Sequence, residues 1–239
     1  MQGKKLVQLS GVQPFTQLDF PGRLASIAFL PGCNFRCGYC HNPEFVLTDR
    51  LVQTSQSWIP EDVFLNFMDQ RIGALDGVVI SGGEPTLHRG LPDFIRRIRE
   101  RGFQVKLDTN GSLPEVLRPL LSERLLDYVA MDVKTSLERY PELVGSCVRP
   151  EAIRESITLI KEHAPEYKFR TTILPKLHGS REVAGLLNLV RGSKRYALQA
   201  YRPAITLDPL FGAYDPPSES FLTAIANQFR PHVDELIIR

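Results

Sequence analysis

Long hydrophobic runs and a strong excess of charge of either sign are both missing from this chain of 239 residues. No apolar stretch approaches the roughly 20 residues of a membrane-spanning helix, so we expect no membrane span. The charged residues at the N-terminus are not followed by an apolar segment, so we also expect no secretory signal peptide. A net charge of +2 gives no indication of a nucleic-acid partner.

Cysteine is scarce, with four residues in the whole chain. A secreted disulfide framework would spread its cysteines along the sequence, whereas three of these four fall in one short segment. We therefore expect a reducing environment and a cytoplasmic protein. The remaining composition, 43% hydrophobic and 23% charged, is typical of a globular chain that buries a sizeable core.

Three common motifs are absent as well. There is no Walker A loop and no G-x-G-x-x-G fingerprint, so neither of these routes to nucleotide binding is supported. The chain also has no nucleophile elbow, which argues against a Ser-His-Asp hydrolase of that type.

Short apolar runs alternate with amphipathic stretches along the chain. The expected strands cover residues 25–30, 77–80, 103–107, 128–131, 169–174, 195–198 and, as a last short strand, 236–238. The expected helices cover residues 60–70, 91–101, 114–122, 150–163, 181–190 and 218–229. This alternation predicts an α/β fold with a parallel sheet and outer helices. Because no linker interrupts it, we expect a single domain.

Polar or glycine-containing segments follow most of these strands directly. In chain order they are the cysteine loop at 33–40, then residues 81–85, 108–111, 132–134, 171–172 (on the fifth strand) and 199–201. Sites in parallel α/β folds lie at the carboxyl ends of the strands. We therefore expect these six segments to meet in one site.

The cysteine loop carries Cys33, Cys37 and Cys40 with C-x3-C-x2-C spacing. Thiolates favour soft metals, above all Fe–S clusters, zinc and Cu(I). Three ligands are one too few for a [4Fe–4S] cluster, so one iron would stay open to a small molecule. The alternative is a structural zinc site with His41 or Cys147 as its fourth ligand.

Other strand-end residues allow a binding or a purely structural interpretation. The turn formed by Gly82, Gly83 and Glu84 permits close backbone approach to a ligand, but it is also compatible with an ordinary connecting loop. Asp108 and Asp132 suit binding of a cation, orientation of a ribose or acid–base chemistry, or they cap helices.

Two further residues leave alternatives open. Lys134 either pairs with Asp132 or supplies positive charge to a ligand carboxylate. Cys147 lies far from the other cysteines in the sequence, and we interpret it as structural or incidental.

Taken together, these motifs resemble the radical S-adenosylmethionine superfamily. The cysteine motif has an aromatic residue, Tyr39, before its last thiol, and Ser-Gly-Gly-Glu-Pro follows at 81–85. More stretches are similar to glycyl-radical-enzyme activases, most of all to the anaerobic ribonucleoside-triphosphate reductase activating proteins. These stretches are residues 19–22, 32–43, 106–111, 130–134, 170–172 and 199–203.

The resemblance implies a partial (β/α)6 barrel of the radical SAM type within one domain, 1–239. Its core would cover about 18–203, and 204–239 would form an extension of unassigned role. Cys33, Cys37 and Cys40 would hold one [4Fe–4S] cluster, with S-adenosylmethionine on the fourth iron. The residues implied to contact S-adenosylmethionine are Tyr39, Gly82, Gly83, Glu84, Asp108, Asp132, Lys134, Gln199 and Tyr201. In related activases, the positions of Asp108 and Asp132 also help to hold a monovalent cation.

The resemblance also implies the reaction. One electron from a low-potential donor, such as flavodoxin or ferredoxin, cleaves S-adenosylmethionine to a 5′-deoxyadenosyl radical. That radical removes a glycine Cα hydrogen from a partner glycyl-radical enzyme. The alternatives are a partner of the pyruvate formate-lyase type, or a small-molecule substrate. Residues 43–59 contain no cysteine, so we expect a single cluster.

The ligand assignment predicts opposite effects of two cysteine substitutions. Cys37→Ala removes one of three thiolates and should abolish the cluster, whereas Cys147→Ala should retain it. Iron, zinc and sulfide analysis after anaerobic purification checks this and separates a cluster from a zinc site. A Cys37→Ala protein that keeps its brown absorbance would contradict the assignment.

Overall fold

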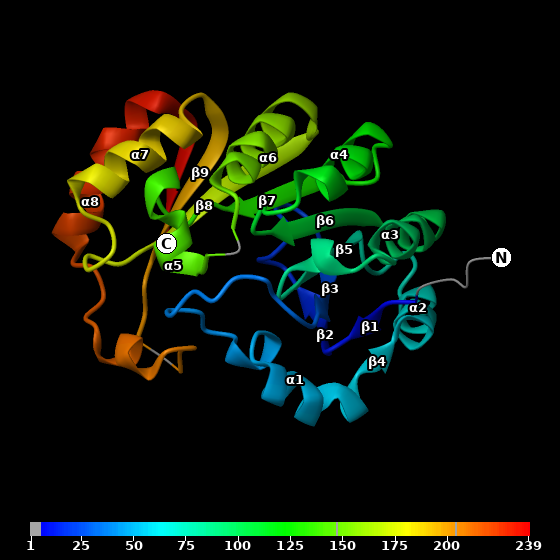
Figure 1. Cartoon of the computed structure of the whole chain (residues 1–239). Coiled ribbons are helices and arrows are strands. Elements are labelled where there is room, and N and C mark those ends of the chain that lie inside the picture. Colours follow the sequence, from blue (N-terminus) through cyan, green and yellow to red (C-terminus); the bar gives the residue numbers. More distant parts are fainter. Residues whose placement is uncertain (1–5, 147, 204) are drawn as a thin grey trace.

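The computed structural model describes residues 6–146, 148–203 and 205–239, and an eight-stranded sheet forms its centre (Figure 1). The strand order is β10 (Val233–Ile238), β9 (Ser193–Ala200), β8 (Glu166–Ile173), β7 (Tyr128–Asp132), β6 (Gln104–Thr109), β5 (Gly77–Gly82), β3 (Ala25–Leu30) and β2 (Gly11–Thr16). All neighbouring strands are parallel except β2, which is antiparallel to β3. The strands form an open arc, so the barrel is partial (Figure 1).

Most helices lie on the outer face of this arc (Figure 1). The α-helices are α1 (Thr48–Thr54), α2 (Glu61–Asp69), α3 (Leu91–Glu100), α4 (Pro114–Ser122), α5 (Tyr140–Val144), α6 (Pro150–His163), α7 (Ser180–Val190) and α8 (Glu219–Phe229), and α1 lies apart from the outer layer, on the side of the cysteine loop (Figure 1). A small antiparallel pair, β1 (Gln8–Leu9) with β4 (Ile59–Pro60), lies beside α2. In the ranges that the structure describes, no helix combines the length and apolar character needed to cross a membrane.

The expected α/β fold is confirmed, and the bounds of several elements agree to the residue. The strand at 25–30 and the helices at 114–122 and 150–163 lie where the sequence predicts them. The seventh parallel strand, β10, is longer than predicted and pairs along most of its length with β9. The C-terminal residues therefore extend the same sheet.

Strand β2 was not predicted from the sequence. Its segment contains Pro14 and alternates poorly between apolar and polar residues. Proline cannot donate a ladder hydrogen bond, so it is tolerated mainly in edge strands, and β2 is an edge strand. Its assignment depends on pairing with β3, a contact without a local sequence signature.

The two faces of the sheet have different chemistry because side chains alternate along each strand. Residues such as Val105, Leu107 and Val129 belong to the main apolar core together with helix residues such as Phe94. The alternate positions on β6, β7 and β8 are largely polar and face the inside of the arc. They include Lys106, Asp108, Asp132, Lys168, Arg170 and Thr172.

Helix α2 differs from its prediction in one respect. The apolar pattern of residues 60–70 predicts one buried face formed by Val63, Phe64, Phe67 and Met68, but Val63 is 56% exposed, whereas Leu65 is 2% exposed. The buried residues are Glu61, Phe64, Leu65 and Met68, which follow the i, i+3, i+4, i+7 spacing of one helix face. This buried face is hard to predict from the sequence because its first residue, Glu61, is charged. The buried Glu61 carboxylate accepts a hydrogen bond from the amide of Val7 and pairs with Arg97.

This geometry predicts unequal effects on stability within α2. Leu65→Ala should lower the free energy of unfolding by about 2–5 kcal/mol, because it leaves a cavity in the core. Val63→Ala, the matched exposed control, should change it by less than about 0.5 kcal/mol. Urea unfolding of the reduced protein measures both values, and equal losses would contradict the assigned helix face.

Candidate functional site

A cavity of about 220 Å³ opens at the carboxyl ends of the parallel strands. It brings together most of the residues that the sequence placed in a site. Of these, the cavity is lined by Cys33, Cys37, Tyr39, Cys40, Gly82, Gly83, Asp108, Asp132 and Lys134. Segments that lie about 100 residues apart in the sequence therefore meet in one cavity at the ends of the strands.

The three cysteines lie on the loop that leaves β3. All three are free thiols, and Cys37 is buried. The amide of Cys40 donates to the carbonyl of Cys37 at 3.0 Å, which closes the turn between these two thiols. Burial raises the pKa of Cys33 to about 11 and that of Cys37 to about 12. Both thiols are therefore protonated at neutral pH in the metal-free protein, and binding of a metal would release their protons.

The donor set fits a cluster better than a single ion. No three His, Cys, Asp or Glu side chains of the described residues are spaced to hold one metal ion. A [4Fe–4S] cluster takes each thiolate on a different iron, so its ligands need to line one cavity without converging on a point. The Tyr39 hydroxyl is buried with no protein hydrogen-bond partner, so a polar group of a cavity-lining residue remains unsatisfied.

His41, the alternative zinc ligand, also lines the cavity, but it contacts another segment. Its ring stacks on Tyr201, with 5.5 Å between the centroids, and its Nε2 lies 3.0 Å from the carbonyl oxygen of Arg202. Cys147, the other alternative ligand, lies outside the described residues.

The glycine turn after β5 contacts the cysteine loop directly. A Cβ on Gly83 would lie 2.0 Å from the carbonyl oxygen of Gly32, so no larger residue fits there. The amide of Glu84 also donates to that oxygen, at 2.7 Å. The turn thus needs glycine for close approach to the cysteine loop, although Gly82 and Gly83 line the cavity as expected.

The Glu84 side chain is placed differently from its predicted role. Its carboxylate is completely buried and does not line the cavity. It accepts hydrogen bonds from the Thr86 amide (3.1 Å) and hydroxyl (2.5 Å), from the Thr109 hydroxyl (2.8 Å) and from the Asn110 amide (2.6 Å). Burial raises the pKa of this carboxyl. Glu84 therefore joins the turn to the end of β6.

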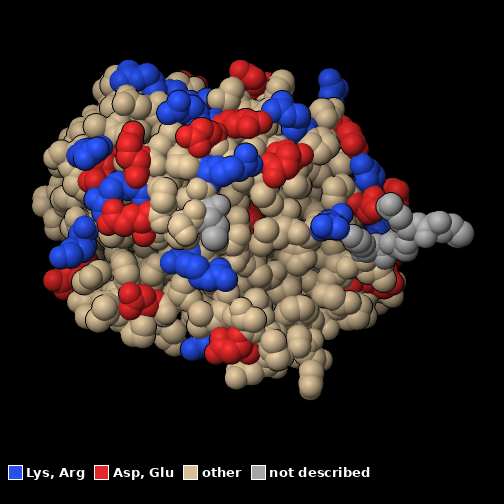
Figure 2. Space-filling model, in the orientation of Figure 1, with Lys and Arg blue, Asp and Glu red and all other residues tan. Residues whose placement is uncertain are grey.

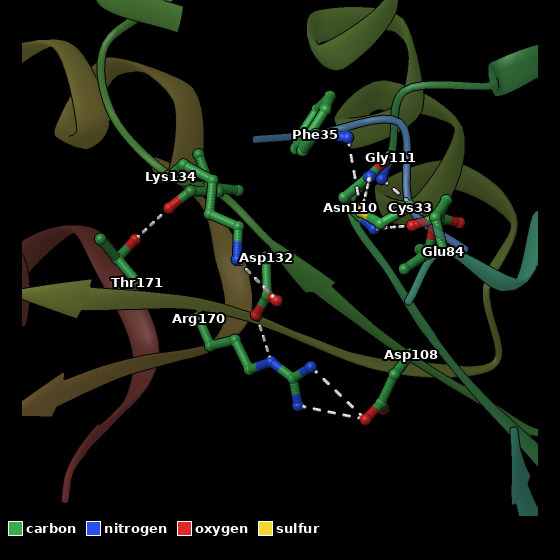
Figure 3. Close-up of polar contacts among 12 residues, drawn as sticks. Cys33, Phe35, Glu84, Asp108, Asn110, Gly111, Asp132, Lys134, Arg170 and Thr171 are labelled. Carbon is green, nitrogen blue, oxygen red and sulfur yellow. Dashed lines mark hydrogen bonds and ion pairs between the residues drawn. The ribbon is translucent and has the colours of Figure 1, made fainter. Parts of the chain in front are cut away.

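A chain of alternating charges crosses the inner face of the sheet (Figure 3). Arg170 pairs with Asp132 and lies 3.4 Å from Asp108, Lys134 lies 2.9 Å from Asp132, and Lys106 pairs with Asp108. Burial opposes ionisation of Asp132, but the neighbouring Arg170 and Lys134 hold its pKa well below the usual range. The same balance, with Arg170 and Lys106 as the cations, lowers the pKa of Asp108.

These contacts resolve the alternatives at Lys134 and identify a residue that sequence reasoning undervalued. Lys134 both pairs with Asp132 and lines the cavity. The sequence leaves Arg170 either as a charge for a ligand carboxylate or as a surface or edge residue, and in the structure it bridges the two carboxylates from a central strand. The sequence does contain a sign of this position: Arg170 alternates with Lys168 and Thr172 along β8, so all three side chains lie on the same inner face of the sheet.

Gln199 and Tyr201 lie outside the cavity lining. Gln199 is half-buried on β9, opposite Thr172. Tyr201 is fully buried, and its hydroxyl donates to the carbonyl of Phe211 at 2.7 Å. The cavity also includes residues outside the six predicted segments, among them Phe45 and Val46.

Comparison with known proteins places these features in a family. The family model described as the Radical SAM superfamily matches residues 27–184. A protein of Methanocaldococcus jannaschii, named as a candidate glycyl-radical enzyme activating enzyme, is 33% identical over 236 residues, which cover 97% of this chain and 95% of that protein. The 7-carboxy-7-deazaguanine synthase of Methanopyrus kandleri is 35% identical over 48% of this chain and 51% of its own.

A solved structure shares the fold. Streptococcus suis SuiB superposes with a TM-score of 0.63 at 14% sequence identity. The match covers 89% of this chain and 48% of SuiB. At this level of identity the likeness concerns the fold alone.

The chain of charges predicts that loss of Arg170 lowers the free energy of unfolding by an amount that depends on pH. Arg170→Met should lower the free energy of unfolding at pH 7 by about 2–3 kcal/mol, less than the roughly 3–5 kcal/mol for fully buried pairs, since the side chain is 19% exposed. The deficit should shrink as pH falls towards about 4, because the variant's carboxylates take up protons before those of the wild type.

Urea unfolding between pH 7 and pH 4 measures this effect. Arg170→Lys is the matched control: it keeps the charge but cannot bridge two carboxylates in the same way, so its deficit should be smaller. A deficit of Arg170→Met that is independent of pH would contradict the role of the two carboxylates.

Proposed function

The chain belongs to the Radical SAM superfamily, and we propose that it is a glycyl-radical-enzyme activating enzyme whose target is an anaerobic ribonucleoside-triphosphate reductase. The family implies a [4Fe–4S] cluster and S-adenosylmethionine. The observation that carries the proposed activity is the match to the Methanocaldococcus jannaschii relative, which extends over nearly the whole of both chains. The choice of reductase as target is supported by the motif set between residues 19 and 203.

Cys33, Cys37 and Cys40 would hold the cluster at the cavity, and S-adenosylmethionine would complete the fourth iron. When bound, the two groups supply a carbon-centred radical that removes a hydrogen atom from a glycine Cα of the partner. The protein's own contribution is orientation and exclusion of water. Phe35 and Val46 add apolar surface to the cavity wall, next to the polar strand ends.

Charge on the cavity wall would orient the ligand. The Lys134 ammonium lines the cavity and is held in place by Asp132, so it suits a ligand carboxylate. The backbone of Gly82 and Gly83 faces the same space and would hold the ligand amino group. Asp108 and Asp132, the two positions that the resemblance connects with a monovalent cation, pair with Arg170, Lys106 and Lys134 in this structure.

The surface near the site suits a protein partner. The part of the molecule formed by α1 and residues 205–214 shows few charged side chains, in contrast to the outer helices (Figure 2). Large apolar side chains are exposed on these two segments, with Val52 67%, Leu210 69% and Ile205 76% exposed. Such uncharged, apolar surface is typical of protein contacts, here with the glycyl-radical enzyme and with a low-potential donor such as flavodoxin or ferredoxin.

A second candidate function is radical chemistry on a small molecule. It is favoured by the similarity of about half of the chain to a 7-carboxy-7-deazaguanine synthase. Turnover of S-adenosylmethionine that is coupled to a small substrate, with no protein partner present, would distinguish this function.

Electron paramagnetic resonance tests the proposed activity. The reduced, reconstituted protein should generate a glycyl-radical doublet when it is mixed anaerobically with S-adenosylmethionine and an anaerobic ribonucleotide reductase. Cys37→Ala is the negative control. A doublet only with a pyruvate formate-lyase type partner would change the target, and no doublet with any glycyl-radical enzyme of the same organism would refute the activity.

A further inference from the structure

The residues after Pro203 had no assigned role, but part of this segment lies across the cysteine loop. We call residues 205–214 the strap; in Figure 1 it is the orange segment beside the blue cysteine loop. The amide of Leu207 donates to the carbonyl of Cys40 at 2.9 Å, and the amide of Asp208 donates to the carbonyl of Gly38, also at 2.9 Å. Both acceptors belong to the turn that carries two of the three thiols.

A ring from the strap also fills the space over this turn. Phe211 packs so closely on Gly38 that a Cβ there would lie 2.3 Å from Phe211 Cε2. The backbone of Gly38 is not left-handed, so this glycine is required for space and not for conformation. The same ring lies 6.2 Å from the ring of Tyr39, measured between centroids. Both residues between Cys37 and Cys40 therefore contact Phe211.

The strap has its own fixed structure. The Asp208 side chain accepts a hydrogen bond from the Leu210 amide at 3.0 Å and so caps the short helix Pro209–Ala213. The hydroxyl of Thr206 donates to the carbonyl of Asp208 at 2.8 Å. These local bonds give the Phe211 ring a defined position relative to the backbone that bonds the cysteine loop.

The strap is anchored to the end of β9 at the same place. The fully buried Tyr201 donates its hydroxyl proton to the carbonyl of Phe211, and its ring stacks on His41, the residue after Cys40. Tyr201 and His41 thus join β9, the strap and the cysteine loop. This explains why Tyr201 is buried away from the cavity.

We infer that the strap is a positioning element, which holds the turn from Cys37 to Cys40 in its cluster-binding form and covers the Tyr39 side of the cluster from solvent. Phe211 and Tyr201 act as positioning residues through Gly38, Tyr39 and His41. A short loop with a glycine has many conformations, and contacts that select one of them reduce the entropy lost when the metal binds. This role concerns the cluster and is independent of which partner the enzyme activates.

Steric rescue provides a sharp test. Gly38→Ala should clash with Phe211 and lower the iron and sulfide bound per chain after anaerobic reconstitution. The double variant, Gly38→Ala with Phe211→Ala, removes the clash and should retain more iron than Gly38→Ala alone. Phe211→Ala alone should bind the cluster but lose its visible absorbance in air several-fold faster than the wild type. Leu210→Ala, an exposed change in the same short helix, is the control and should match the wild type in bound iron and in the stability of the absorbance in air.

A second readout separates positioning from general stability. The EPR spectrum of the reduced cluster should respond to added S-adenosylmethionine differently in Phe211→Ala than in the wild type, while far-UV circular dichroism of the apo-protein stays unchanged. The inference is overturned if the double variant binds no more iron than Gly38→Ala. It is also overturned if Phe211→Ala matches the wild type in both air stability and spectrum. Failure to form a glycyl radical would refute the proposed activity and leave these results unaffected.

Discussion

The bridge that Arg170 makes between Asp108 and Asp132 is the constraint on which the site depends (Figure 3). Two carboxylates at the ends of neighbouring strands repel each other when they are removed from water, and they stay ionised only with cations between them. The parallel register places Asp132 directly opposite Arg170. Lys106 and Lys134 complete the pairing at the two ends of the chain of charges.

The cysteine loop is in turn held from two sides. On one side, the glycine turn after β5 packs against Gly32, and the buried Glu84 carboxylate ties this turn to Thr109 at the end of β6 and to Asn110 just after it. On the other side, the strap bonds the carbonyls of Gly38 and Cys40. The ligand loop has little secondary structure of its own, so its form depends on these two neighbouring segments.

Much of the fold followed from local sequence patterns. The helices Pro114–Ser122 and Pro150–His163 have proline at their first position and a regular apolar face, and both begin and end where predicted. Strand β2 was missed and the buried face of α2 was only partly predicted, for related reasons. Pro14 argues against a strand in the sequence, and the edge strand β2 forms through its pairing with β3. Glu61 argues against a buried helix position, and its buried charge is neutralised by Arg97.

The sequence by itself predicted the proposed ligand set and its place at the strand ends. The spacing of Cys33, Cys37 and Cys40 is local, and the rule that sites form at strand ends needs only the order of the elements. Tertiary structure decided which groups face a ligand and which support the loop. The resemblance implied Glu84 and Tyr201 as ligand contacts, but neither lines the cavity. The Glu84 carboxylate accepts hydrogen bonds from Thr109 and Asn110, which lie 25 and 26 residues further along the chain. The Tyr201 hydroxyl anchors the strap. Arg170 meets Asp108 across 62 residues. Such pairs leave no periodic signal in the sequence, because they arise only when separate strands are brought into register.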